Sequence, residues 1–208
     1  MQMCGRCSLV FNLTIRPNES KIILSEFYGG EHGYGSSAAR VRQYTVIAVL
    51  TALYLVLSLL FKIPVGGDIK LDLGYIVLMV SVIYLGAAPA AVIGGLGALL
   101  ESILTSRKGI APGWILMNVI VGLICGWVLY KRKDAPVKTL VIAACIVVPV
   151  SMLPAVTVKT LVDFALYPYT DVVALKIATA ATALVTDSAV MLIFGLPLSV
   201  ALRGRVKF

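Results

Sequence analysis

The residues of this chain that could do chemistry are polar side chains set inside long apolar segments. Trp114 and Asn118 are four residues apart, and so are Lys159 and Asp163, so each pair would share one face of a helix. Polar groups inside a bilayer are costly and usually face an interior or a water-filled cavity. The candidates are Glu101, Trp114, Asn118, Lys159, Asp163, Tyr167, Lys176 and Asp187. Aromatic rings for a ligand's ring and charges for its polar substituents predict a small-molecule site.

Each candidate also has a plainer interpretation. Lys159 and Asp163 could form an ordinary ion pair within one helix, and Lys176 could extend its amine to the membrane interface. Tyr167 and Trp114 could belong to an interfacial aromatic belt. Asp187 lies about sixteen residues before the basic C-terminal end, roughly 24 Å along a helix, with no second acidic residue expected at its depth. We therefore interpret Asp187 as a buried structural or substrate-contacting acid.

The sequence lacks the motifs of several catalytic classes. It contains no GxxxxGK[ST] phosphate loop, no HExxH and no GxSxG. Cys4 and Cys7 form a CxxC beside the single histidine, His32, but Cys125 and Cys145 fall in apolar segments, so four zinc ligands are not brought together. We expect no enzyme activity, no metal and no cofactor in this chain.

The elements that must hold the candidate residues are predicted by hydropathy. Of the 208 residues, 60% are hydrophobic and 13% are charged, which leaves too few polar groups to cover a soluble domain. Six long apolar segments follow one another at residues 44–61, 73–86, 87–104, 112–130, 137–166 and 172–202. The sequence therefore predicts an all-α integral membrane protein with six transmembrane helices over residues 41–208. Residues 1–40 are predicted to be a polar, flexible cytoplasmic tail.

Lys and Arg set the predicted orientation. One side would hold Arg40, Arg42, Lys131, Arg132, Lys133, Lys138, Arg203, Arg205 and Lys207. The other side would hold only Lys62, Lys70, Arg107 and Lys108. The positive-inside rule then puts both termini in the cytoplasm and most candidate site residues in the outer half. Basic residues that flank spans also argue against nucleic-acid binding. The external loops at residues 63–71 and 105–113 could close over a ligand or serve as plain connectors.

Small residues recur at spacing four on two of the predicted helices. The first helix contains Ala48-xxx-Ala52, and the third contains Ala87-xxx-Ala91-xxx-Gly95. Such faces let another helix approach closely, either a helix of a partner or a helix of the same bundle.

These features resemble the substrate-binding S component of an energy-coupling factor (ECF) transporter. The resemblance covers about residues 42–206 and includes the stretch DLGYIVLMVSVIYLG at residues 72–86, which precedes a small-residue-rich helix and Glu101. It implies a vitamin- or micronutrient-binding subunit of the bacterial cytoplasmic membrane. It also implies a transmembrane coupling subunit and two cytoplasmic ATPases that use ATP. By position, Ala48, Ala52, Ala87 and Ala91 would face the coupling subunit, while Gly95 departs from the alanine pattern.

Substrate capture from outside, followed by inward release, is therefore the predicted function. The alternative is a stand-alone secondary transporter or channel, although its inverted repeats or paired broken helices are not visible in the sequence. A membrane scaffold without a ligand is a third possibility. Folate, pantothenate, riboflavin and a queuosine precursor all remain open as the nutrient.

Overall fold

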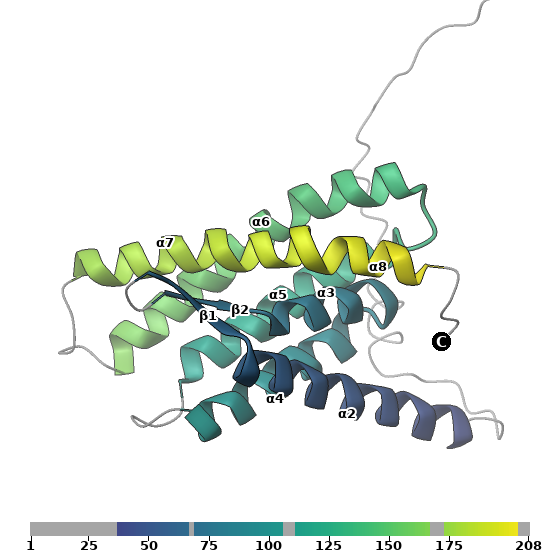
Figure 1. Cartoon of the computed structure of the whole chain (residues 1–208), viewed down its shortest axis with the longest axis horizontal. Helices are drawn as coiled ribbons and strands as arrows, with labels where there is room; N and C mark the ends of the chain where they lie inside the picture. The colour runs from purple at the N-terminus through teal and green to yellow at the C-terminus, as the bar shows by residue number, and fades with distance from the viewer. Residues whose placement is uncertain (1–36, 67–68, 106–110, 167–172, 204–208) are drawn as a thin grey trace, which may run out of the picture. The chain divides into compact units, whose positions relative to one another are not determined.

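The computed structural model describes residues 37–66, 69–105, 111–166 and 173–203, and the tail predicted for residues 1–40 lies outside these ranges up to residue 36. The helices in chain order are α2 (Ser37–Leu60), α3 (Gly74–Tyr84), α4 (Ala87–Thr105), α5 (Pro112–Tyr130), α6 (Val137–Leu166), α7 (Val173–Val190), a π-helical turn η1 (Met191–Gly195) and α8 (Leu196–Leu202). A hairpin of β1 (Lys62–Gly66) and β2 (Ile69–Asp72) separates α2 from α3 (Figure 1).

Within the described residues, five helical stretches are long and apolar enough to cross a membrane. They cover residues 41–60, 87–105, 112–130, 137–166 and 180–202. Large apolar side chains such as Val49 on α2 and Ile142 on α6 are exposed along them, as expected for helices that face lipid. The all-helical membrane architecture is thus confirmed in its main part. The predicted sixth span is not confirmed. Helix α3 has 11 residues and is about 16 Å long, whereas the hydrocarbon core is about 30 Å thick.

The hairpin occupies the segment that we expected to be a loop. β1 and β2 pair antiparallel from Lys62↔Asp72 to Gly66↔Ile69, with an irregularity between Pro64 and Gly66. Alternating apolar residues on either side of a glycine pair favour such a hairpin. In Figure 1 the hairpin lies at the same end of the bundle as the end of α6 and the start of α7. We call this end of the bundle the hairpin end.

Helix α3 is the buried centre of the fold. It packs against α2, α4, α5 and η1, and almost all of its side chains are buried. The helix ends at Tyr84, and Gly86 follows two residues later with a φ of 88°, a left-handed conformation that suits glycine. The backbone N–H groups of Leu85 and Gly86 both donate to the carbonyl of Ser81, at 2.9 and 3.3 Å. This cap produces a tight turn before α4.

Helices α4 and α5 approach closely because small residues face each other. A Cβ atom on Gly122 would lie 2.8 Å from the Cα of Ala91, and one on Gly126 would lie 2.5 Å from the Cα of Ala87. Both obstacles are backbone atoms, so they cannot rotate away. We call this contact the α4–α5 seam.

The last span continues from α7 through η1 into α8. Pro197 follows at the start of α8 and lacks a backbone N–H, and its ring would clash with the carbonyl four residues earlier in a regular α-helix. The wider π turn accommodates this residue without breaking the span. At Gly195 the turn meets α3, where an added Cβ would lie 2.6 Å from Met79 Cβ.

We expect the Gly122→Ala substitution to destabilise the bundle. Its methyl group would press on the backbone of α4, and overpacking of this kind typically costs about 1–3 kcal/mol. The measurement is the thermal unfolding midpoint of the full chain in detergent, with Val49→Ile on the exposed face of α2 as a control that adds one carbon. Equal midpoints for the two variants would show that α4 and α5 do not touch at the seam.

Candidate substrate-binding site

Buried polar side chains from most of the helices gather in one region of the bundle. Tyr54, Tyr75 and Asp187 interact electrostatically with one another, and each of them also interacts with the carboxyls of Asp72 and Glu101. These five residues come from α2, the end of β2, α3, α4 and α7, and all are buried. We call them the polar cluster.

Asp72 holds the start of α3 against α2. Its Oδ1 accepts a hydrogen bond from the Ser58 hydroxyl at 2.6 Å and another from the Gly74 backbone N–H at 2.7 Å. A Cβ on Gly74 would lie 2.6 Å from Ser58 Oγ, so only glycine fits this contact. The hairpin, α2 and α3 are therefore joined through one carboxylate.

Tyr54 spans the interior from α2 to α5. Its ring passes Gly97 of α4, where an added Cβ would lie 2.3 Å from the Tyr54 Cδ1 atom. Its hydroxyl donates to Asn118 Oδ1 at 3.3 Å, and Asn118 Nδ2 donates to the backbone carbonyl of Trp114 at 3.0 Å. Glu101 lies one turn beyond Gly97, so the same face of α4 carries the glycine and the carboxylate.

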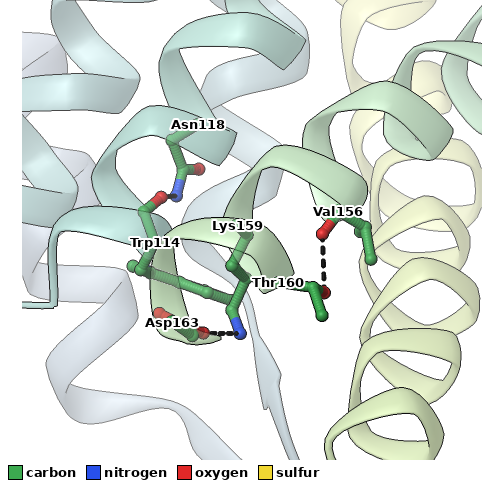
Figure 2. Close-up of polar contacts among 6 residues, drawn as sticks. All are labelled: Trp114, Asn118, Val156, Lys159, Thr160 and Asp163. Carbon is green, nitrogen blue, oxygen red and sulfur yellow. Dashed lines mark hydrogen bonds and ion pairs between the residues drawn. The ribbon is translucent and has the colours of Figure 1, made fainter. Parts of the chain in front are cut away.

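Aromatic and charged groups lie beside one another where α5 meets α6. The Trp114 ring packs edge-on against Tyr75, with 6.4 Å between ring centroids and an interplanar angle of 84°. Lys159 Nζ and Asp163 Oδ2 form an ion pair of 2.9 Å, and the two side chains are 21% and 26% exposed. Figure 2 shows the Trp114 side chain extending from α5 towards this pair on α6. A Cβ on Gly113 would lie 2.5 Å from Asp163 Oδ1, so α5 and α6 are in close contact here.

The Tyr75 hydroxyl and the Asp187 carboxyl form a buried polar pair between α3 and α7. Tyr75 is 0% exposed and Asp187 is 1% exposed. The two side chains interact with each other, so each is a polar partner of the other. Buried polar groups are usually partnered in this way.

The structure brings together most of the predicted site residues. Glu101, Trp114, Asn118, Lys159, Asp163 and Asp187 lie in or beside the polar cluster. Tyr167 lies outside the described residues, and so does the side chain of Lys176, although α7 includes its backbone. Lys159 and Asp163 do form the ion pair that we gave as the plainer interpretation.

Sequence reasoning missed Tyr54, Asp72 and Tyr75. The two tyrosines sit in apolar runs, where an aromatic residue gives no sign that it points inward. Asp72 directly precedes the apolar segment at residues 73–86, so the sequence did not single it out as a site residue. Asp187 interacts electrostatically with Asp72 and Glu101, two acidic residues that the sequence did not link to it.

The small-residue motifs differ in their surroundings. Ala48 and Ala52 are exposed on α2, whereas Ala91 and Gly95 are buried and Ala87 is half-buried in the α4–α5 seam. An added Cβ on Gly95 would lie 2.7 Å from the Val119 side chain of α5. The small residues of α4 thus pack against α5 within the bundle. Those of α2 are exposed, and we call their side of the helix the open α2 face.

No group of three or more His, Cys, Asp or Glu side chains within the described ranges could hold a metal ion. Cys4, Cys7 and His32 lie outside those ranges. Cys125 is buried with its thiol 2.9 Å from the Ser151 hydroxyl, and Cys145 is exposed. The chemistry available here is hydrogen bonding, charge and aromatic contact.

Comparisons with known proteins agree with this picture. Among solved structures, the crystal structure of FolT bound with folic acid matches over 78% of this chain and 95% of its own, with 17% sequence identity and a TM-score of 0.54, which shows a shared fold. No curated protein sequence matches. The family model described as "ECF-type riboflavin transporter, S component" matches residues 38–204, and therefore nearly all of the helical bundle. The chain belongs to this family of transporter S components and not to an enzyme family.

Proposed function

We propose that this chain is the substrate-capture subunit of an ECF-type importer and binds a small ring-containing nutrient from outside. The observation that carries the proposal is the polar cluster, which sits inside an otherwise apolar bundle. Burial of three carboxyl groups among membrane helices is costly, and intramembrane ionisable residues usually mark a ligand or ion pathway. Family membership favours a ligand over an ion.

The residues around the cluster suit a ring with polar substituents. Trp114 and Tyr75 offer aromatic faces and edges, while Asn118 and the Lys159–Asp163 pair offer donors and acceptors. Riboflavin is the first candidate because of the family's description, and folic acid is the second because the FolT structure contains it.

The proposed topology has both termini in the cytoplasm of a bacterial cell. This requires six crossings, and β2 together with α3 can supply the short one. Four strand residues add about 13 Å to the roughly 16 Å of α3, close to the thickness of the hydrocarbon core.

The opposite end of the bundle has the features of a cytoplasmic interface. The Lys131 and Lys133 ammonium groups lie 4.9 and 4.1 Å from the ring centroids of Trp127 and Tyr130. Arg203 Nη2 donates to the backbone carbonyl of Ala135 at 2.6 Å. Basic residues and an aromatic belt at one end support the orientation in which the hairpin end faces outward.

Release inward needs partners in this proposal. A transmembrane coupling subunit would dock on the open α2 face at Ala48 and Ala52, and two cytoplasmic ATPases would supply the energy and use the ATP. The chain itself then needs no cofactor and performs no catalysis.

Uptake by reconstituted proteoliposomes tests the proposed function. We expect accumulation of labelled riboflavin or folic acid only when the chain is combined with a coupling subunit, two ATPases and ATP. Uptake by the isolated chain would instead favour the secondary transporter. No binding and no uptake of either vitamin would contradict the proposal.

Replacing Lys159 with Met should weaken vitamin binding far more than it weakens the fold. A partly exposed pair at spacing four contributes only about 0.5 kcal/mol to stability or less. A lost charged hydrogen bond to a ligand costs about 1.5–3 kcal/mol, or roughly tenfold or more in affinity. Calorimetric titration and thermal unfolding measure the two effects, with the exposed Lys138→Met as the control. A large fall in stability with unchanged affinity would assign the pair a structural role only.

Replacing Ala48 and Ala52 with Leu should abolish coupled uptake without changing vitamin binding. The larger side chains would fill the open face of α2 and keep a partner helix at a distance. Co-purification with the coupling subunit provides the direct measurement. Val150→Leu, on an exposed position of α6, adds bulk elsewhere on the lipid-facing surface and should leave the complex intact. A stable complex with the α2 variant would move the docking surface elsewhere.

A further inference from the structure

Cationic side chains gather at the end of the bundle opposite the hairpin end, where α8 finishes (Figure 1). Arg203, at the end of α8, belongs to this group because its Nη2 donates to the backbone carbonyl of Ala135 at 2.6 Å. Ala135 lies in the loop between α5 and α6, and the other cations lie within four residues of it in the sequence. The group, which we call the basic patch, consists of Lys131, Arg132, Lys133, Lys138 and Arg203.

The positive charge of the basic patch is not balanced within the part of the chain that the structure describes. Asp134 is the only carboxylate among residues 131–138, and its side chain is exposed. No member of the patch forms an ion pair with a described carboxylate. Neighbouring cations repel one another, and an anion bound among them would offset this repulsion.

Two aromatic rings hold the lysine ammonium groups beside the apolar surface of the bundle. Lys131 Nζ lies 4.9 Å from the centroid of the Trp127 ring, and Lys133 Nζ lies 4.1 Å from the centroid of the Tyr130 ring. Trp127 is 55% exposed and Tyr130 is 38% exposed. Each ammonium group is thus drawn to a ring that is itself accessible from outside the bundle.

Contacts with two other parts of the fold hold these groups in place. A Cβ on Gly86 would lie 3.3 Å from Tyr130 Cγ, so the Tyr130 ring rests on the turn between α3 and α4. The hydrogen bond from Arg203 to Ala135 joins the loop to the end of α8. A ligand would therefore meet cations that are already positioned, which reduces the entropy lost on binding.

The surface below the basic patch is apolar. Leu116, Ile120 and Leu123 precede Trp127 at spacings of three or four residues, so they share one face of α5 with it. All of them are exposed or half-buried, as expected for a face in contact with lipid tails. A ligand with an anionic head and an apolar tail would contact both the cations and this face. An acidic protein segment would match the charge alone.

We propose that the basic patch binds the phosphate group of an anionic phospholipid, whose acyl chains lie along α5 beside Trp127. Phosphate oxygens accept charge-assisted hydrogen bonds from lysine and arginine side chains. Clusters of basic residues next to the cytoplasmic ends of membrane helices are typical of such recognition. The assignment to the cytoplasmic leaflet rests on the proposed topology. The lipid site itself does not depend on which nutrient is bound.

Quenching of Trp127 fluorescence by brominated lipid tests the site directly. The full chain carries Trp114→Phe, so that Trp127 is the remaining tryptophan, and is placed in phosphatidylcholine bilayers. Quenching by brominated phosphatidylglycerol is compared with quenching by brominated phosphatidylcholine. We expect a preference for phosphatidylglycerol of at least about fivefold at Trp127. Replacing Lys131 and Lys133 together with Gln should remove most of it, because each basic residue near an anionic headgroup contributes about this factor.

Two pairs of substitutions serve as controls. Lys131→Arg with Lys133→Arg keeps both charges and should retain the preference. Arg107→Gln with Lys108→Gln removes the same charge from the segment between α4 and α5, on the other side of the membrane in the proposed topology, and should leave the preference unchanged.

The other possible results would overturn the inference. Equal quenching by the two lipids would exclude an anionic-lipid site beside Trp127, and a preference unchanged by the Gln pair would exclude the two lysines. A preference abolished by inorganic phosphate in the buffer would show a site for free phosphate. A Gln pair that loses the coupling subunit on co-purification but keeps the lipid preference would assign the patch to a protein partner. Vitamin uptake is measured separately, so failure of the lipid site leaves the proposed function standing.

Discussion

The structure depends on one constraint, which is that lipid offers no hydrogen bonds to a polar group. Every polar side chain within the bundle must find a partner inside the protein or a ligand that serves as one. Tyr54, Asn118 and Asp72 meet this condition through contacts between helices. Asp187 and Tyr75 meet it through each other, as a buried pair between α7 and α3. The same constraint explains why donors and acceptors converge, as the Ser58 hydroxyl and the Gly74 N–H do on Asp72.

Convergence of this kind requires helices that approach closely, and small residues make the approach possible. The α4–α5 seam places the backbone of Gly122 against Ala91, and Gly97 leaves room for the Tyr54 ring to cross from α2 towards α5. Packing and site are thus coupled, since the glycines that close the bundle also let long polar side chains reach its interior. The short helix α3 completes the arrangement, because the hairpin before it replaces part of a span and carries Asp72 to the cluster.

Much of the architecture was predictable because hydropathy and helical spacing are local properties. The spans, the turn at Gly86 and the pairing of Lys159 with Asp163 follow from residues close in sequence. The hairpin was missed because each of its apolar runs is short and the two runs are separated by glycine. The inward direction of Tyr54 and Tyr75 was missed because a tyrosine in an apolar run looks the same whether it faces lipid or core. A small-residue motif likewise does not name its partner helix, which is why Ala91 was assigned to another subunit and lies against α5.

In the proposed function, the ligand binds beside Trp114 at the polar cluster. The sequence contains two tryptophans, so Trp127→Phe leaves Trp114 alone and Trp114→Phe leaves Trp127 alone, at the other end of α5. Fluorescence of each variant should be recorded during titration with riboflavin and folic acid. We expect a saturable change in Trp114 emission with at least one of these vitamins and no saturable change in Trp127 emission. A saturable change confined to Trp127, or none in either variant, would contradict it.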